Sequence, residues 1–272
     1  MKPAPFAYDD PREFDEALAL LTREGEDVKV LAGGQSLVPL LNFRLARPDR
    51  LVDLNRVEEL AYIRPEGDVL RIGALARHAD LERSEEVAAG WPLLTQAVRF
   101  VGHPQIRARG TVCGSVAHAD PAAELPVALA ALDARFHVRS ARGSRLLGAE
   151  ELFLGFFTTA LEPDELLAEI EVPAQPGVGG SAFVEHARTH GDFALGGAAA
   201  VAGGADPRLA LLAAGPVPVR ARAAEAALAS GGSFEEAADA AVADLELTGE
   251  EADWRRALLR ELARRALEEA AA

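Results

Sequence analysis

The chain has a single cysteine, Cys113, among its 272 residues. One cysteine excludes a disulfide within the chain, and it excludes a zinc site or an iron–sulfur cluster held by four of the chain's own cysteines. No run of 18 apolar residues occurs, so the sequence predicts no transmembrane helix. The N-terminal stretch MKPAPFAYDDPREF lacks the apolar core of a signal peptide. Together these absences predict a cytoplasmic location.

Basic residues are scarce relative to acidic ones. The chain has 28 Lys and Arg against 43 Asp and Glu, which gives a net charge of −15 at pH 7. Binding to nucleic acids or to anionic membranes needs a basic surface, so this balance argues against both kinds of partner. Apolar residues make up 49% of the chain, which suffices for a well-buried core in one or two domains.

Apolar periodicity predicts alternating helices and strands. Gly25 and Ser36 are expected at helix ends, Gly25 after the first helix and Ser36 as the cap of the second. The predicted helices span 11–24, 37–44, 78–89, 92–101, 121–132, 221–229, 234–243 and 251–272. The predicted strands span 28–32, 51–54, 69–73, 135–140, 166–172, 182–186 and 195–202.

Two features describe the second half of the chain. Prolines and glycines accumulate in PAQPGVGG, residues 173–180, which predicts a domain edge. In the last helix an i+4 stripe is made by Trp254, Leu258, Leu262 and Ala266. We expect this stripe to pack into its own core, with a partner interface as the alternative.

The stretch VLAGGQSL, residues 30–37, is the first that could carry function. A strand that ends in Gly33 and Gly34 lets the backbone approach a ligand closely. The helix that follows would direct backbone N–H groups at a phosphate or pyrophosphate. The stretch is neither a Gly-x-Gly-x-x-Gly nor a Walker motif, and an ordinary tight turn is the alternative interpretation.

The second stretch, residues 102–124, is rich in Gly, Ser, Thr and His amid apolar helices. Thr111, Ser115 and backbone amides could hold phosphate oxygens, while Asp120 and Glu124 could accept hydrogen bonds from sugar or ribityl hydroxyls. One alternative is a metal site made by His118, Asp120 and Glu124, although the spacing fits no known metal motif. Another is a nucleophilic Cys113, but a lone cysteine is more often a small apolar residue.

The third stretch, EHARTHGDFA, covers residues 185–194 and links two predicted strands. His186, Arg188 and His190 could contact a cofactor or could be solvated loop residues.

Taken together, these stretches resemble the FAD-binding medium subunit of the molybdenum hydroxylases. The carrying motifs are AGGQSLVPLLNFRLARPDRLVDL (32–54), GHPQIRARGTVCGSVAHADPAAELP (102–126), FFTTALEPDELLAEIEVP (156–173), FVEHARTHGDFALGGAAA (183–200) and the tail WRRALLRELARRALEEA (254–270). The resemblance covers nearly the whole chain, and the first two motifs are specific.

The resemblance implies an α+β fold with a vanillyl-alcohol-oxidase-like (PCMH-type) FAD-binding domain. That domain would span 1–173, with subdomains of about 1–56 and 57–173, and a C-terminal α+β domain would span 178–272. The FAD would be bound noncovalently. Molybdopterin and [2Fe-2S] clusters would lie only on partner subunits, namely a large molybdopterin subunit and a small iron–sulfur subunit.

The resemblance also implies cofactor-binding positions. Ala32–Ser36 and Thr111–Ser115 would bind the pyrophosphate, Glu124 and Asp120 would face FAD hydroxyls, Leu167 the adenine and Asp192 the isoalloxazine. The full set is Val30, Leu31, Ala32, Gly33, Gly34, Gln35, Ser36, Leu37, Val101, Thr111, Cys113, Gly114, Ser115, Asp120, Glu124, Leu167 and Asp192. No metal ligand and no catalytic side chain is predicted, because the redox chemistry would be that of the flavin.

Some residues depart from the family pattern. Cys113 stands where many members have Gly, and its Cβ would narrow the pyrophosphate turn slightly. His186 and Thr189 stand where many have Lys and Arg, and Phe193 where Tyr is frequent. Contacts that other family members would make with a charged side chain at positions 186 and 189, or with a phenol hydroxyl at position 193, are therefore not expected in this chain.

The function implied is that of an electron-transfer flavoprotein subunit. Electrons would pass from an iron–sulfur partner through FAD to an external acceptor, and the substrate would be oxidised at a molybdenum cofactor on another chain. Two alternatives are a stand-alone FAD-dependent oxidoreductase and an FAD-free scaffold subunit. The sequence does not identify the substrate, the acceptor or the subunit stoichiometry.

Overall fold

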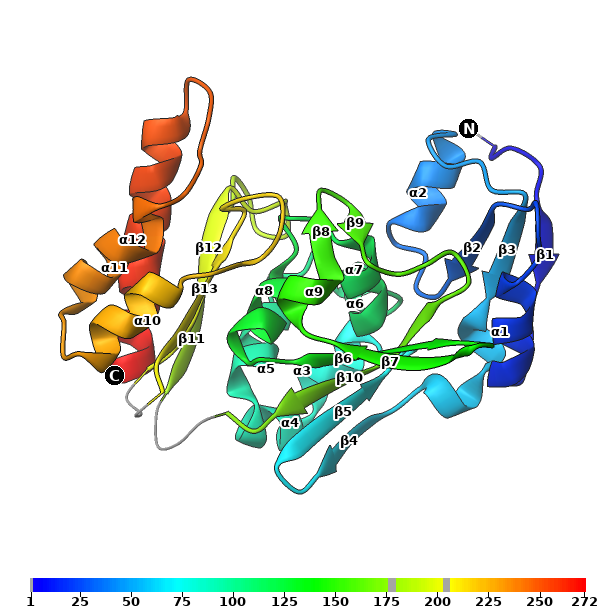
Figure 1. The fold of residues 1–272 in the computed structure, drawn as a ribbon, viewed down its shortest axis with the longest axis horizontal. Helices are drawn as coiled ribbons and strands as arrows, with labels where there is room; N and C mark the ends of the chain where they lie inside the picture. Colours follow the sequence, from blue (N-terminus) through cyan, green and yellow to red (C-terminus); the bar gives the residue numbers. More distant parts are fainter. Residues whose placement is uncertain (1, 176–179, 203–205) are drawn as a thin grey trace.

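A computed structural model describes residues 2–175, 180–202 and 206–272 of the chain. Three main β-sheets follow one another along the molecule, with helices packed between and beside them (Figure 1). The predicted α+β class is therefore confirmed. Within the described ranges, no helix combines the length and the apolar character that crossing a bilayer requires.

The first sheet is small and parallel, in the order β1 (Ala7–Asp9), β3 (Arg50–Asp53) and β2 (Val28–Leu31). Helix α1 (Phe14–Leu21) buries its apolar side. The helix ends earlier than predicted, so Gly25 lies in the following turn, at φ +78°, rather than at the helix end. Helix α2 (Leu37–Asn42) follows β2 and is also shorter than predicted.

The second sheet is antiparallel and forms the middle of the molecule. Its strands, in spatial order, are β4 (Ile63–Glu66), β5 (Val69–Gly73), β10 (Leu166–Pro173), β6 (Arg135–Ser140) and β7 (Gly143–Leu147). The helices of this region are α3 (His78–Arg83), α4 (Glu85–Gly90), α5 (Pro92–Val98), α6 (Pro104–Arg107), α7 (Val112–His118), α8 (Glu124–Ala131) and α9 (Ala149–Leu152). The pair β8 (Phe153–Gly155) and β9 (Thr158–Thr159) and the 3-10 turns η1 (Leu54–Arg56) and η2 (Glu58–Leu60) complete it.

The single predicted helix 78–89 is two helices. Ser84 has an extended backbone, and its Oγ accepts a hydrogen bond from the Val87 amide at 3.2 Å, so it begins α4 as an N-cap. Serine at this position therefore interrupts a pattern that reads as continuous in the sequence.

Helix α8 is buried on every side, as suits a helix between two layers. On one side of it lies the third sheet, with strands β11 (Ser181–His186), β12 (Gly196–Val201), β13 (Arg208–Leu212) and β14 (Val219–Arg220). Strands β11 and β12 correspond to the strands predicted at 182–186 and 195–202, and they pair antiparallel. Of the predicted boundary at 173–180, residues 176–179 lie outside the described residues.

Helices α10 (Arg222–Ala229) and α12 (Ala252–Ala271) pack on the far face of the third sheet, and α11 (Phe234–Ala243) packs against both of them (Figure 1). The expected α12 stripe is wrong at its first position, because Trp254 is 48% exposed. The buried side of α12 instead carries Leu259, Leu262, Ala263, Ala266, Leu267 and Ala270.

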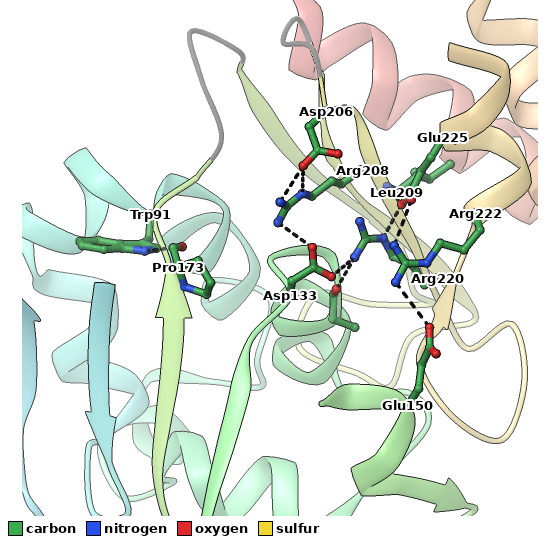
Figure 2. Close-up of polar contacts among 11 residues, drawn as sticks. Trp91, Asp133, Glu150, Pro173, Asp206, Arg208, Leu209, Arg220, Arg222 and Glu225 are labelled. Atoms are coloured by element: carbon green, nitrogen blue, oxygen red, sulfur yellow. Dashed lines mark hydrogen bonds and ion pairs between the residues drawn. The ribbon is translucent and has the colours of Figure 1, made fainter. Parts of the chain in front are cut away.

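Ion pairs join the third sheet to the end of α8 (Figure 2). Arg220 on β14 donates to the Ala130 carbonyl at 2.9 Å and to Asp133 at 2.6 Å, and Arg208 on β13 pairs with Asp133 at 3.0 Å. Arg220 also pairs with Glu225 of α10. These contacts fix the C-terminal sheet against the helix that leads toward the site described next.

Candidate functional site

A cavity of about 540 Å³ opens between the first sheet and the helices of the middle region. Both glycine-rich stretches line it, together with the beginning of α8 and the loop between β11 and β12. Its size lies within the roughly 300–1,000 Å³ typical of small-molecule sites.

The loop after β2 needs both of its glycines. A Cβ on Gly33 would lie 2.6 Å from the carbonyl oxygen of Arg109, which is a backbone atom of the second loop. Gly34 has φ +73°, a conformation that residues with a side chain rarely adopt. The two glycine loops therefore touch backbone to backbone at one wall of the cavity.

Ser36 stands at the predicted N-cap position of α2, but it does not cap the helix with its side chain. Ser36 has a helical backbone, and its side chain makes no capping hydrogen bond. The turn is instead closed by the Val38 amide, which donates to the Gly34 carbonyl at 3.0 Å. Ser36 nevertheless lines the cavity, so its hydroxyl is not committed to a helix cap.

The second loop leads into α7 through Thr111. The Thr111 hydroxyl accepts a hydrogen bond from the Gly114 amide at 3.1 Å and caps the helix. A Cβ on Gly114 would lie 2.5 Å from that hydroxyl oxygen. Gly114 is therefore required for the cap, and both residues line the cavity.

Cys113 points away from this cavity. Its side chain is 3% exposed and lines a smaller neighbouring cavity that Leu167 also lines. Burial raises the pKa of the thiol, so the thiol stays protonated at neutral pH. A protonated, buried thiol is a poor nucleophile, which argues against the alternative of a reactive cysteine.

Acidic side chains also line the cavity or lie beside it. Glu124 begins α8 and is 8% exposed, and burial raises its pKa to about 7. Glu185 on β11 lies near it, and burial together with the charge of Glu124 raises its pKa to about 8. Asp120 accepts a hydrogen bond from the Ala122 amide at 2.9 Å and also lines the cavity.

The metal alternative is not supported in the described part of the chain, where no three His, Cys, Asp or Glu side chains gather around a point that could hold an ion. His118 instead stacks at 5.2 Å, ring centre to ring centre, on Phe157. Burial lowers the pKa of His118, so the ring is neutral at pH 7.

The loop between β11 and β12 reaches the mouth of the cavity. Gly191, Asp192 and Phe193 line it, and Phe193 is 72% exposed there. A Cβ on Gly191 would lie 2.7 Å from the His103 ring, so the loop touches the start of α6. His186 and Arg188 are exposed and do not line the cavity.

The structure gathers most of the predicted site residues. Those that line the main cavity are Val30, Ala32, Gly33, Gly34, Gln35, Ser36, Leu37, Val101, Thr111, Gly114, Ser115, Asp120, Glu124 and Asp192. Cys113 and Leu167 line the smaller cavity, and Leu31 lines neither, since its side chain packs beside Gly34.

Sequence reasoning missed several lining residues, of which His78 is the most unusual. It begins α3 and is 4% exposed, and burial lowers its pKa to about 4. Its ring lies against Gly110, where a Cβ would come within 2.9 Å of Nδ1. No local motif marks His78, because only the pairing of residues 76–78 with 110–112 brings it to the cavity.

Comparison with known proteins agrees with this geometry. Residues 4–175 match the FAD binding domain in molybdopterin dehydrogenase, and residues 181–270 match the CO dehydrogenase flavoprotein C-terminal domain. The chain belongs to this family. It is an FAD-binding medium subunit of the molybdenum hydroxylase type, and its class is that of the oxidoreductases.

Individual relatives are similar over most of the chain. The alpha subunit of a 6-hydroxypseudooxynicotine dehydrogenase complex from Paenarthrobacter nicotinovorans is 50% identical over 74% of this chain and 68% of its own. The carbon monoxide dehydrogenase medium chain of Hydrogenophaga pseudoflava is 38% identical over 98% and 97%. A solved carbon monoxide dehydrogenase from that organism, lacking the Mo-pyranopterin moiety of its cofactor, matches at TM-score 0.94 and 39% identity over 99% and 98%.

The cavity suits the chemistry of FAD. Glycine backbones leave room for a diphosphate to approach, and Asp120 and Glu124 offer oxygens to ribose or ribityl hydroxyls. Val30, Leu37 and Val101 supply apolar surface for a ring system. The residues present therefore fit the cofactor for which the family is named.

Proposed function

We propose that this chain binds FAD in the cavity and relays electrons from iron–sulfur clusters on a partner subunit to an external acceptor. The observation that carries the proposal is the contact between two glycine loops at the wall of a cavity that Asp120 and Glu124 also line. The relatives are named as subunits or chains of dehydrogenase and hydroxylase complexes, which supports the partnership. The single cysteine leaves a four-cysteine cluster to another chain.

The roles proposed for the residues follow the cavity. Ala32–Ser36 and Thr111–Ser115 hold the pyrophosphate, and Glu124 with Asp120 accepts hydrogen bonds from hydroxyls. Leu167, in the smaller cavity, would contact the adenine. Asp192 and the exposed Phe193 lie at the mouth, on the side of the isoalloxazine. FAD supplies the one- and two-electron redox chemistry, while the chain binds it, orients it and limits access of water.

The same proposal divides the chain into an FAD-binding part, residues 1–173, and a C-terminal part, residues 178–272. This division is supported by one cluster of buried side chains that lies wholly within residues 182–270. The C-terminal cluster joins one face of the third sheet to α10, α11 and α12. The other cluster fills the two remaining sheets and the helices around them, and it also includes third-sheet residues, namely Phe183, Ala199, Val201, Ala210 and Leu212.

Two measurements test the function. The purified chain should show flavin absorbance, and acid precipitation should release the flavin into the supernatant because no covalent bond is expected. A tagged chain purified from its native host should bring down two further chains with molybdenum and iron. A flavin-loaded monomer that oxidises substrate at full rate alone would contradict the proposal.

A further inference from the structure

The side chain of Arg77 donates hydrogen bonds to the second glycine loop and to Asn55, which in turn bonds to the first glycine loop. Arg77 precedes α3, and its Nη1 donates to the carbonyl oxygen of Arg109, just before Gly110. Its Nη2 donates to Oδ1 of Asn55 at 2.5 Å. Asn55 lies in η1, which directly follows the first sheet, whereas Arg77 and Arg109 belong to the middle region.

Asn55 continues the connection to the first loop. Its Nδ2 donates to the carbonyl oxygen of Ala32 at 2.9 Å and to Oδ1 of Asp53. The orientation of this amide is fixed by its neighbours, because Arg77 offers only donors and the Ala32 and Asp53 oxygens only accept. The chain of bonds therefore runs from Ala32 through Asn55 and Arg77 to Arg109.

The carbonyl groups of Ala32 and Arg109, at the two ends of this series of hydrogen bonds, lie on either side of the contact between the loops. Ala32 precedes Gly33, and the Arg109 oxygen is the atom that a Cβ on Gly33 would meet at 2.6 Å. The segment after Arg77 adds backbone pairing, since the His78 amide donates to the Gly110 carbonyl at 3.0 Å. Both loops are thus held at a spacing that leaves no room for a side chain between them.

We infer that Arg77 and Asn55 form a clasp that sets the spacing of the two glycine loops, and that FAD affinity depends on this clasp. The inference rests on the proposed function of the cavity. Arg77 and Asn55 are positioning residues here, because neither lines the cavity and both act through the loop backbones.

A planar guanidinium suits this task, and a lysine would not replace it. Arg77 uses two nitrogens in fixed directions for two acceptors on different segments. A lysine keeps the charge but presents a single nitrogen at the end of a flexible stem. The clasp therefore depends on geometry, and retaining the positive charge alone should not preserve it.

The experiment measures the Kd of FAD for the flavin-stripped full chain by quenching of flavin fluorescence. We expect Arg77→Ala, Arg77→Lys and Asn55→Ala each to raise the Kd about 10- to 100-fold, as suits the loss of hydrogen bonds from a charged donor. The double variant Arg77→Ala/Asn55→Ala should lose no more than either single variant, because both residues act in one chain of bonds. Hydrogen exchange of the amides in 31–36 and 109–114 should accelerate together in each variant.

The matched control is Arg71→Ala. Arg71 on β5 also makes several ion pairs, to Glu66, Glu169 and Glu171, but it bonds to neither loop. The Arg71→Ala variant should therefore have the wild-type Kd for FAD and wild-type rates of amide hydrogen exchange in both loops. Losses that add in the double variant, or an Arg77→Lys variant with the wild-type Kd, would overturn the clasp.

A further variant separates this inference from the proposed function. If the wild-type chain takes up no FAD, or if Gly33→Ala leaves the Kd unchanged, the proposed site is wrong and the clasp is overturned with it. If Gly33→Ala weakens binding while the Arg77 and Asn55 variants bind as wild type, only the clasp is overturned.

Discussion

Small residues have different effects in two regions of this chain, the C-terminal cluster and the wall of the cavity. Among the residues that the structure describes, alanine makes up 13 of the 19 buried members of the C-terminal cluster, and none of the 19 is aromatic. The other cluster contains Trp91, Phe136, Phe153 and Phe183. Small side chains in the C-terminal part let α12 lie close to the sheet, whereas glycines near β2 and α7 leave space at the cavity wall.

Glycines in the two regions differ in the same way. A Cβ on Gly180 would lie 2.2 Å from the Ala270 carbonyl oxygen. Gly180 is therefore needed where the backbone just before β11 passes close to the end of α12. Gly34 and Gly114 line a cavity of about 540 Å³ instead. The same residue type therefore serves close packing in one part and ligand access in the other. Substitutions in the two parts should consequently affect stability and FAD binding separately.

The largest effect is expected for Gly33→Val. The new side chain would overlap the Arg109 carbonyl and force the two loops apart. We expect FAD affinity to fall at least about 1,000-fold, which corresponds to about 4 kcal/mol of binding free energy. Flavin content after gel filtration and the Kd of the stripped chain measure this.

The control for Gly33→Val is Gly90→Val at the end of α4, where an added Cβ meets nothing within 4 Å. It should bind FAD normally. Circular dichroism must show that Gly33→Val is still folded. Normal flavin content in folded Gly33→Val would remove this loop from the proposed site.

Arg220→Ala tests the junction between the two parts (Figure 2). The Arg220 side chain is 6% exposed, and its loss would leave the Glu225 carboxylate, 12% exposed, without this partner. Removing one member of a buried ion pair costs about 3–5 kcal/mol, so we expect a loss of that size in the free energy of unfolding. Urea denaturation measures it, and Arg142→Ala, whose pair with Asp164 is exposed, should cost under about 1 kcal/mol.

Leu262→Ala tests the alanine-rich cluster by itself. Leu262 on α12 is buried against the third sheet, and a cavity there should cost about 3 kcal/mol of unfolding free energy. The FAD Kd of the folded variant should change less than about twofold, because α12 does not line the cavity. A large loss of affinity would show that the two parts are not independent. Trp254→Ala, at an exposed position of the same helix, is the control.

Two glutamates with raised pKa values, Glu124 and Glu185, should make the stability of the flavin-free chain depend on pH. The pKa of Glu124 is about 7 and that of Glu185 about 8, against 4.5 for an ordinary glutamate. Between pH 4.5 and these values the folded chain holds more protons than the unfolded chain, so stability should fall as pH rises. For Glu124 the fall is on the order of 3 kcal/mol at most, since one pKa unit corresponds to about 1.4 kcal/mol.

Thermal unfolding of the stripped chain at pH 5 and pH 8 measures this dependence. Glu124→Gln should flatten it and should also lower the pKa of Glu185 by removing a neighbouring negative charge. Glu150→Gln, an exposed carboxylate on α9, should leave the dependence as in the wild type. A Glu124→Gln variant with an unchanged pH profile would contradict the assignment.

Local patterns predicted the elements whose signal is contained in a single segment. The strands at 28–32 and 135–140 and the helices at 221–229 and 234–243 agree with β2, β6, α10 and α11 within a residue or so. Short elements such as β1, β8 and β9 went unpredicted, because two or three residues carry too little periodicity and depend on their partners in the sheet.

Some features of the site were likewise predictable from the sequence, and others were not. The glycine loops and the acidic residues at 120 and 124 could be identified from residue types, since glycine pairs and clustered polar residues are unusual among apolar segments. The direction of the Cys113 thiol and the backbone conformation of Ser36 could not, because both depend on how α7 and α2 pack.

The sequence by itself determined the two glycine loops, the lack of cysteine ligands for a metal cluster and the alanine-rich helices of the C-terminal part. These depend on side-chain chemistry and on local backbone freedom. Only the tertiary structure decided that Gly33 touches Arg109, that Arg77 and Asn55 connect the loops, and that Glu185 lies near Glu124. Each of these pairs is far apart in the chain, so the contact exists only once the sheets and helices have packed together.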